Sequence, residues 1–514
     1  MGGDGRGRPA EAAPEYRDEA ARLARRHRGD GDVLRLRFRR LGQRPGDQRG
    51  RRQVSAVEAY LVAHADEALE DLKAFCRIPS VSTDPAYRDG IRSAANFVAQ
   101  RLTRAGFPTV EIIETDGHPA VFGEIIGTAD APTILVYGHY DVQPPDPVEK
   151  WATPPFEPTV RDNRLYARGV SDDKGPVLIP ILVVEAFLKA TGRLPLSIKI
   201  LVEGEEESGS PHFSPLVDTM RHRLACDLVV SADGAMWRAD RPSMTVASRG
   251  MVALDVVVTG AAKDLHSGRH GGSAPSPIRA LAAMLASLHD RDGAVTVPGF
   301  TDGVIPPDPA ILDAIDAAGF DSAAYFAGIG APAPDPLPSG HDLLVRQWLV
   351  PTLEFNGIFG GYSGPGTKTV IPSSAGAKIT CRLVAGQEPG KVAEAIRRHL
   401  ETHLPTGYSL DITRHGPGTK AFSIDPGLPA LAIAETLLGE MMGATSLRVA
   451  MGATIPIGSV FKEHLGVGTI FFSFSTSDED YHAPNEFFRL DNFSIGQIAW
   501  ARLFQRLGLS MGGK

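Results

Sequence analysis

Residues 133–141 read T-I-L-V-Y-G-H-Y-D, an apolar run that ends in a histidine and a carboxylate. The run from Thr133 to Tyr137 has the length and the β-branched content of a buried strand. In an open α/β sheet, functional side chains collect just beyond the carboxyl ends of the strands. A histidine with a carboxylate close behind it can present a metal ligand and its supporting acid. The stretch therefore predicts that His139 and Asp141 form one corner of a metal site.

The composition indicates a globular chain of two or more domains. Its 514 residues exceed what one core usually holds, and 43% hydrophobic and 22% charged residues are ordinary values. No apolar run approaches the roughly 18 residues of a membrane span, and the net charge of −8 argues against a nucleic-acid partner. The three cysteines, at 76, 226 and 381, are far apart, which favours a reducing cytoplasm and excludes a thiolate zinc site.

The N-terminal segment differs from the rest of the chain. The first 52 residues hold fifteen arginines, no lysine and eight acidic residues, so they carry +7 and the remainder −15. Residues 1–53 are therefore expected to be a disordered Arg-rich extension, or to be translated from a start codon upstream of the natural one. The alternative is an arm for an anionic partner such as nucleic acid, but no pattern of interleaved aromatic residues supports it.

The order of predicted elements indicates one module inserted into another. Residues 54–244 and 415–514 alternate strands with helices, as in the two parts of an α/β domain. Residues 245–414 follow the order β-α-β-β-α-β of a ferredoxin-like domain. Within this domain, residues 290–349 are rich in Pro, Gly, Ala and Asp, which suggests either a functional excursion or local helices.

Ligand-type side chains recur just past apolar strand-like runs or in turns that enter helices. They are His139, Asp172, the pair Glu206–Glu207, Asp233 and His482. Each alone has an ordinary explanation; Asp172 and Asp173, for example, could cap the helix that follows them. Their recurrence at equivalent topological positions is much harder to explain without a metal site.

Two-metal hydrolysis needs this set of residues. Ions about 3.5–4 Å apart, bridged by a carboxylate and a water, each take three protein ligands from two histidines, a bridging Asp and two terminal carboxylates. A further carboxylate must pass the proton of the bridging water to the leaving amine. The residues alone do not say whether Glu206 or Glu207 takes this role, nor whether Asp172 or Asp173 bridges. Asp141 would hold the other ring nitrogen of His139.

Seven motifs together resemble those of the M20 family of metallopeptidases, in particular its carnosinase-like dipeptidase branch. They are G-H-Y-D-V-Q-P (138–144), W-x-x-P-P-F-E-P (151–158), R-G-V-S-D-D-K-G (168–175), E-G-E-E-E-S-G-S (203–210), D-L-H-S-G (264–268), G-T-K-T-V-I-P (366–372) and H-A-P-N-E (482–486). The resemblance runs from about residue 55 to 507. It implies an α/β fold: a central mixed-sheet zinc-peptidase catalytic domain with an inserted ferredoxin-like lid and dimerisation domain.

The resemblance also implies the role of each candidate in the metal centre. It implies His139 and Asp233 on one metal, Glu207 and His482 on the other, and Asp172 between them. Glu206 would be the general acid/base, Asp141 would support His139, and the peptide bond between Asp172 and Asp173 would be cis. Two Zn²⁺ ions are expected, with Mn²⁺ or Co²⁺ as alternatives.

For the lid, the resemblance implies contacts with the substrate and with a second subunit. His266 would reach the active site of the partner in a homodimer and stabilise the oxyanion there. Arg382 would grip the carboxylate of the substrate, a task that suits a guanidinium fork. Asn356 and Thr454, the latter in the turn Gly452–Pro456, would be further substrate contacts.

The leading hypothesis is a cytoplasmic enzyme that hydrolyses a peptide bond in dipeptides or small peptides with a free C-terminal carboxylate. The alternative within the family is an N-acyl amino acid deacylase that uses the same metals and base. A non-enzymatic alternative is a binding protein with a dead site, but every expected metal and acid/base position is retained.

Overall fold

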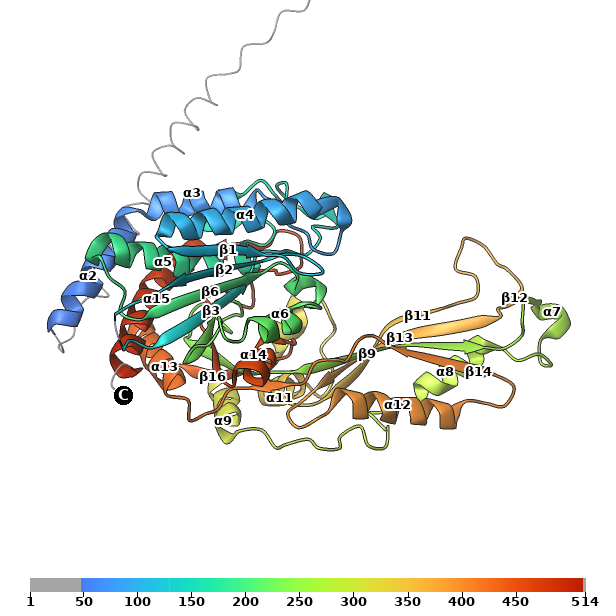
Figure 1. The fold of residues 1–514 in the computed structure, drawn as a ribbon. Helices are drawn as coiled ribbons and strands as arrows, with labels where there is room; N and C mark the ends of the chain where they lie inside the picture. Colours follow the sequence, from blue (N-terminus) through green and yellow to red (C-terminus); the bar gives the residue numbers. More distant parts are fainter. Residues whose placement is uncertain (1–47, 129, 512–514) are drawn as a thin grey trace, which may run out of the picture.

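In the computed structural model, residues 48–128 and 130–511 are described, so most of the predicted extension 1–53 lies outside the described residues. The first described helix, α2 (Gln48–Ala63), already begins within the predicted extension. The folded chain consists of a large α/β part and a second part that projects from it (Figure 1).

Six strands form the central sheet, in the order β1-β2-β6-β3-β7-β17. They are β1 (Thr109–Ile113), β2 (Ala120–Ile125), β6 (Ser197–Glu203), β3 (Thr133–His139), β7 (Leu228–Ser231) and β17 (Thr469–Phe471). The last four strands in this order are parallel, and β1 and β2 form an antiparallel edge. The predicted mixed sheet is therefore confirmed.

The apolar run that ends in His139 is the central strand β3, which pairs with β6 on one side and β7 on the other. All its residues except Thr133 are buried, and β6 is buried throughout. A strand covered on both faces needs a continuous apolar run rather than an alternating one, which explains the composition of these segments.

Helices pack against this sheet and against one another. The helix α4 (Arg88–Ala105) contacts β1 and β2, and α5 (Gly175–Thr191) contacts β3, α2 and α15 (Leu490–Met511). Because α5 is surrounded in this way, it is apolar on nearly all sides. The remaining helices of this part are α3 (Ala65–Cys76), α6 (Phe213–Met220), α13 (Pro429–Met442) and α14 (Ile457–Leu465).

Two small sheets complete the α/β part. The first has the order β15-β8-β16, with β15 (Phe422–Ser423), β8 (Ser243–Ser248) and β16 (Leu447–Met451). The second has the order β18-β5-β4, with β18 (Phe487–Arg489), β5 (Arg164–Tyr166) and β4 (Thr159–Arg161). The pairing of β18 with β5 brings the late H-A-P-N-E segment beside the segment that leads to Asp172.

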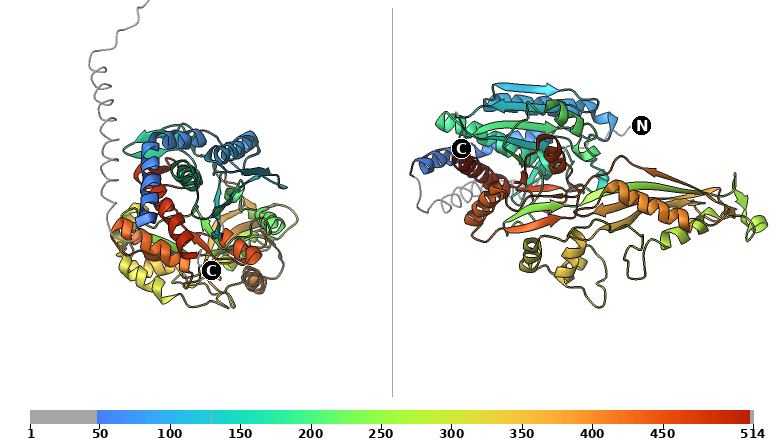
Figure 2. Two further views of the ribbon diagram at one scale, coloured as in Figure 1. Left: turned by 60° about the vertical axis from the view of Figure 1, so that its left-hand side comes forward. Right: turned by 60° about the horizontal axis from the view of Figure 1, so that its bottom comes forward.

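The projecting part, which we call the lid, is an antiparallel sheet in the order β11-β13-β9-β14. Its strands are β9 (Gly250–Thr259), β11 (Thr352–Gly360), β13 (Ser374–Leu383) and β14 (Ser409–Arg414), and its two long helices are α8 (Pro277–Ala286) and α12 (Pro389–His403). Burial alternates along β9, because helices cover one face of the sheet only. The order of these strands and helices confirms the predicted ferredoxin-like order (Figure 2). The lid also has a hydrophobic core of its own.

The segment 290–349 contains local helices, one of the two explanations that its composition suggested. They are α9 (Pro309–Ala318), α10 (Ser322–Gly328) and α11 (Gly340–Trp348). The helices α9 and α11 pack against β16, and Ile315 and Leu344 belong to the core of the α/β part. This excursion from the lid therefore folds back onto the α/β part. Over the described residues, every helix is too short or too polar to cross a membrane.

Candidate metal centre and active site

His139 is the last residue of β3, and its side chain is completely buried. Its Nδ1 lies 3.1 Å from the backbone oxygen of Asp141 and 3.4 Å from Oδ1 of the same residue. Its Nε2 lies 3.0 Å from Oδ1 of Asp172. Burial disfavours the charged imidazolium, but the hydrogen bonds with Asp141 and Asp172 outweigh it and raise the pKa of His139 well above its usual range.

Asp172 lies between two histidines from distant parts of the chain. While its Oδ1 faces His139, its Oδ2 lies 3.1 Å from Nε2 of His482, and the same nitrogen is 3.2 Å from Oε2 of Glu207. Burial opposes ionisation of Asp172, but the hydrogen bonds with the two histidines hold its pKa below its usual range. Each oxygen of one carboxylate thus faces a different histidine, which is the geometry of a shared ligand.

Two groups of side chains in the described part of the chain have the composition and closeness of metal ligands. One is His139, Asp172 and Asp233, and the other is Asp172, Glu207 and His482, with ligand atoms within 4.8 Å of one another in each group. Imidazole nitrogen and carboxylate oxygen suit Zn²⁺ and similar divalent ions. Oε1 of Glu207 is buried without a hydrogen-bond partner, as expected of an atom that takes a metal. These residues therefore fit a pair of divalent ions.

The acids of the two groups are crowded together. Burial raises the pKa of Glu207 to about 7 and that of Asp233 to about 6, and the charge of Asp172 adds to both shifts. Burial, together with the neighbouring Asp233, also raises the pKa of Glu206 well above its usual range. Bound cations would favour the ionised forms of such carboxylates, so the electrostatics also fit a metal centre.

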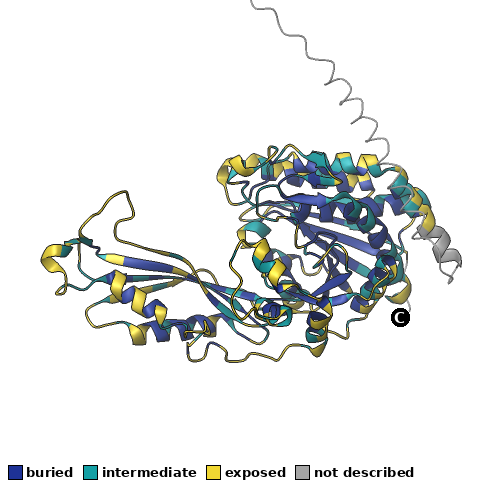
Figure 3. Ribbon diagram, turned by 180° about the vertical axis from the view of Figure 1, so that it is seen from behind, coloured by how far each residue is buried: buried dark blue, intermediate teal, exposed yellow. Residues whose placement is uncertain are grey.

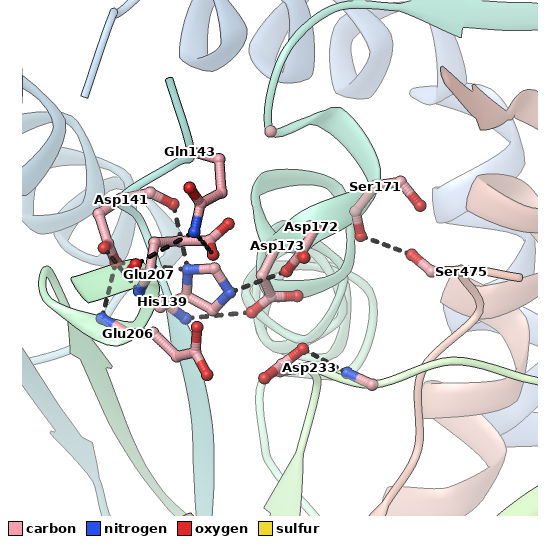
Figure 4. Close-up of polar contacts among 12 residues, drawn as sticks. His139, Asp141, Gln143, Ser171, Asp172, Asp173, Glu206, Glu207, Asp233 and Ser475 are labelled. Carbon is pink, nitrogen blue, oxygen red and sulfur yellow. Dashed lines mark hydrogen bonds and ion pairs between the residues drawn. The ribbon is translucent and has the colours of Figure 1, made fainter. Parts of the chain in front are cut away.

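Asp141 organises the turn that carries the two glutamates. Its Oδ1 accepts the backbone N–H of Glu206 at 3.2 Å, and its Oδ2 accepts that of Glu207 at 3.0 Å. Nε2 of Gln143 donates to the side chain of Glu207 at 2.9 Å. In Figure 4 the carboxylate of Glu207 lies beside Gln143, whereas that of Glu206 points toward Asp233. The two adjacent glutamates thus diverge from one turn.

Asp172 and Asp173 have different surroundings although they are adjacent. The peptide bond between them is cis, as the resemblance implied. Oδ2 of Asp173 accepts the backbone N–H of His139 at 3.1 Å, and burial raises the pKa of Asp173 well above its usual range. Asp173 therefore supports the end of β3, while Asp172 faces the histidines.

Arg382 and Thr454 meet where the lid joins the α/β part. Nη1 of Arg382, on β13, donates to Oγ1 of Thr454 at 2.8 Å, and burial lowers the pKa of the arginine. Arg249, which directly precedes β9, donates from Nε to the backbone oxygen of Gly452 at 2.8 Å. Burial and the nearby Arg382 lower the pKa of Arg249 to about 10. Two guanidinium groups thus hold one turn.

Arg249 is not among the residues that the sequence singled out, and neither are Gln143, Glu486, which accepts the N–H of Asp172, and Arg168, which pairs with Glu486. Gln143 and Glu486 lie within motifs that the sequence already displays, G-H-Y-D-V-Q-P and H-A-P-N-E, so the signal was present. Arg168 likewise begins the motif R-G-V-S-D-D-K-G. Arg249 stands in no such motif, and its contact with Gly452 joins residues 203 apart in sequence.

His266 and Asn356 are exposed on the lid, and neither belongs to the two groups of metal-ligand side chains. His266 ends β10 (Leu265–His266), which pairs with β12 (Val370–Ile371), and its Nδ1 accepts the N–H of Gly268 at 3.1 Å. The adjoining α7 (Ser267–His270) lies at the end of the lid farthest from the central sheet (Figure 1). Asn356 lies at a register shift in the edge strand β11.

Comparison with known proteins identifies the family of the chain. The model of peptidase family M20/M25/M40 matches residues 135–506, a range that contains all of the candidate residues. The chain belongs to this family. It is therefore a hydrolase of the M20 type, and the recognition based on the motifs is confirmed.

Members of the M20 family resemble the chain over most of its length. The human Beta-Ala-His dipeptidase is 30% identical over 474 residues, which cover 88% of this chain and 92% of that protein. The Cys-Gly metallodipeptidase DUG1 of Candida albicans is 29% identical over 452 residues, or 83% of this chain and 92% of that protein. The crystal structure of human carnosine dipeptidase 1 has a TM-score of 0.78 at 28% identity and covers 89% of this chain and 99% of that one.

Proposed function

We propose that this protein is a two-metal dipeptidase that hydrolyses the peptide bond of dipeptides or small peptides with a free C-terminal carboxylate. The observation that most directly supports the two-metal site is the position of Asp172, whose two oxygens lie 3.0 and 3.1 Å from His139 and His482. The support for the substrate class comes from relatives named as dipeptidases, which match the chain along most of its length.

In this proposal each ion has three protein ligands, with Asp172 shared. His139 and Asp233 complete one set, and Glu207 and His482 complete the other. Bound ions would supply Lewis acidity, which would polarise the scissile carbonyl and lower the pKa of the attacking water. Zn²⁺ suits these ligands best, with Mn²⁺ and Co²⁺ as alternatives.

Glu206 is proposed as the general base and then the general acid. It lies beside the metal groups, and burial raises its pKa, which brings a carboxyl closer to the working range of a proton carrier. It would take the proton from the attacking water and give it to the leaving amine. Asp141 supports this role, because it holds the ring of His139 and the backbone N–H of Glu206 together.

Arg382, Thr454 and Asn356 are proposed as the substrate-binding residues. The guanidinium of Arg382 has the planar donors that pair with a carboxylate, and Thr454 orients one of them. A free C-terminal carboxylate on the substrate would therefore be bound at the junction of the lid and the α/β part.

A homodimer through the lid is also proposed. The edge strand β11 exposes Phe355, Ile358 and Phe359, and an edge strand with apolar side chains is suited to pairing with a second copy. His266 directly precedes α7, which lies at the end of the lid farthest from the central sheet (Figure 1). In the dimer it would enter the active site of the partner subunit and stabilise the oxyanion there.

The test is to measure metal content and hydrolysis together on the purified full chain. We expect two divalent ions per chain, turnover of dipeptides such as β-alanyl-histidine and cysteinyl-glycine, and loss of turnover with a chelator that added Zn²⁺ or Mn²⁺ reverses. Activity on N-acyl amino acids alone would favour the deacylase. Metal binding without hydrolysis of dipeptides or N-acyl amino acids would favour a binding protein.

A cytoplasmic location is also proposed. The three free cysteines, two of them buried, support it.

A further inference from the structure

A buried ion pair lies next to the proposed metal centre. Glu486 follows His482 by four residues and is 1% exposed, and its Oε2 accepts a hydrogen bond from Nη1 of Arg168 at 2.8 Å. The side chain of Arg168 is also 1% exposed. Buried charges are costly unless they are paired and hydrogen-bonded, so such a pair needs an explanation.

The carboxylate of Glu486 accepts three further hydrogen bonds, all from the backbone that leads into Asp172. Its Oε2 accepts the N–H of Gly169 at 2.8 Å. Its Oε1 accepts the N–H of Ser171 at 3.0 Å and that of Asp172 itself at 3.2 Å. The Glu486 side chain thus anchors the backbone of Asp172, the residue whose two oxygens face His139 and His482.

The guanidinium of Arg168 extends the contact to a third segment. Its Nη2 donates to the backbone oxygen of Pro144 at 3.2 Å, and its Cζ lies 5.3 Å from the ring centre of Trp151. Pro144 directly follows Gln143, whose side chain holds Glu207 at 2.9 Å. The ion pair therefore joins three segments, which carry His482, Asp172 and the partner of Glu207.

We infer that Glu486 and Arg168 are positioning residues for both metal ions. This role rests on the proposed two-metal function. They bind no metal themselves. They set the backbone from which Asp172 reaches the two ions, and they hold the segments of His482 and Gln143 against it. Residues that orient metal ligands in this way typically change metal affinity by about 10- to 100-fold when they are altered.

The geometry explains why a carboxylate stands at position 486. Each of its oxygens accepts two hydrogen bonds, and an ionised carboxylate has acceptors only. In Glu486→Gln one oxygen becomes an NH₂ group, which cannot accept from an N–H. If the amide oxygen keeps the hydrogen bonds from Arg168 and Gly169, the NH₂ group faces the N–H groups of Ser171 and Asp172. These donors repel one another, so the backbone of Asp172 shifts.

The experiment compares Glu486→Gln with a matched change in another buried pair. Glu185, whose side chain is 12% exposed, accepts a hydrogen bond from the 3% exposed Arg101, between helices α5 and α4, so Glu185→Gln removes the charge from a similar pair that contacts none of the proposed metal ligands. For the wild type and both variants, Zn²⁺ affinity and stoichiometry are measured against a competing chelator, and Tm is measured with and without Zn²⁺. We expect Glu486→Gln to lose about 10- to 100-fold in Zn²⁺ affinity and to gain less Tm from Zn²⁺. Glu185→Gln should lower Tm equally with and without Zn²⁺, at unchanged affinity.

Several outcomes would overturn the inference. Two ions bound by Glu486→Gln with wild-type affinity would mean that the pair only supports the fold. If Glu486→Gln does not fold, the titration is made on Arg168→Lys, which keeps the charge but loses the fork between Glu486 and Pro144; wild-type affinity there would also overturn it. A wild-type protein that binds no Zn²⁺ would instead contradict the proposed function itself.

Discussion

The carboxyl ends of the central strands and the lid are built in opposite ways. At the strand ends, His139, Asp141 and Asp173 are buried and fixed by contacts within one chain. On the lid, His266 and Asn356 are exposed, and the edge strand β11 is exposed along most of its length (Figure 3). The groups proposed for the chemistry, and Arg382 with Thr454 for the substrate carboxylate, are thus assembled by one chain, whereas His266, proposed for the oxyanion, would act only on a second subunit.

The two regions also differ in their electrostatics. Burial raises the pKa values of Glu206, Glu207 and Asp233 at the strand ends, because it removes water from the ionised carboxylates, and the charges of neighbouring acids add to the shift. On the lid, charges such as Asp255 pair at the surface, and neighbouring His415 and Lys378 lower its pKa. Ionisation of the carboxyls at the strand ends is therefore unfavourable without a nearby cation, whereas Asp255 already has cationic partners.

The largest effect is expected from Glu206→Gln, which tests whether the strand ends alone carry the chemistry. Turnover should fall by roughly 10²- to 10⁴-fold, because the proton carrier is lost, while both ions stay bound. Steady-state kinetics and metal analysis check this, with Glu111→Gln as the control, since Glu111 pairs with Arg223 at the surface. A protein that loses metal would mean that Glu206 is a ligand.

A somewhat smaller loss is expected from His266→Ala, which tests whether the lid acts on a second subunit. The kcat should fall by about 10²- to 10³-fold, because one donor to the oxyanion is removed. In a random mixture of His266→Ala and Glu206→Gln chains, half of the dimers hold one intact site, so about a quarter of the wild-type activity should return. Failure to recover activity in dimers shown to have exchanged chains would place His266 in another role.

Arg382→Lys should act on substrate binding rather than on chemistry. Lysine keeps the positive charge but not the guanidinium fork, so KM for dipeptides should rise by roughly 10- to 100-fold with a smaller change in kcat. The comparison substrate is the same dipeptide with its C-terminus amidated, for which the variant and the wild type should differ little. An equal loss on both substrates would show that Arg382 does not bind the carboxylate.

The smallest effect on turnover is expected from a change at Glu203, where the measured quantity is stability instead. Glu203 lies opposite His139 in the pairing of β3 and β6. Burial raises the pKa of Glu203 to about 8 from an ordinary value of 4.5, and the Tyr137 hydroxyl donates to it at 2.5 Å. A raised carboxyl pKa means that the folded state binds the proton more tightly, so this group lowers stability as pH rises from about 4.5 to about 8.

Glu203→Gln should remove this pH dependence. The metal-free variant should match the wild type near pH 4.5 and exceed it above pH 8, by at most about 5 kcal/mol in the free energy of unfolding. Urea unfolding of both proteins across this pH range is the measurement. Parallel stability curves for the two proteins would mean that the Glu203 carboxyl is not the titrating group.

Much of the candidate site could be predicted from the sequence because the side chains proposed as ligands follow local patterns. His139 and Asp233 stand at or just after the ends of apolar runs with the length and composition of buried strands, and Asp172 stands at the entry to an apolar helix. In a parallel sheet the ends of such strands meet at one edge, so the residue order alone was enough to group their side chains. The order of the lid elements was equally visible.

Contacts between distant residues were not predictable in this way. The pairing of Arg168 with Glu486 spans 318 residues, and the choice between Glu206 and Glu207 depends on where Gln143 and His482 lie. The packing of α9 against β16 likewise has no local signature.

Residue type and strand periodicity are local properties, and they were enough to indicate the kind of chemistry. Which oxygen of Asp172 faces which histidine, and which buried pair holds its backbone, depends on side chains that meet only when the whole chain has folded.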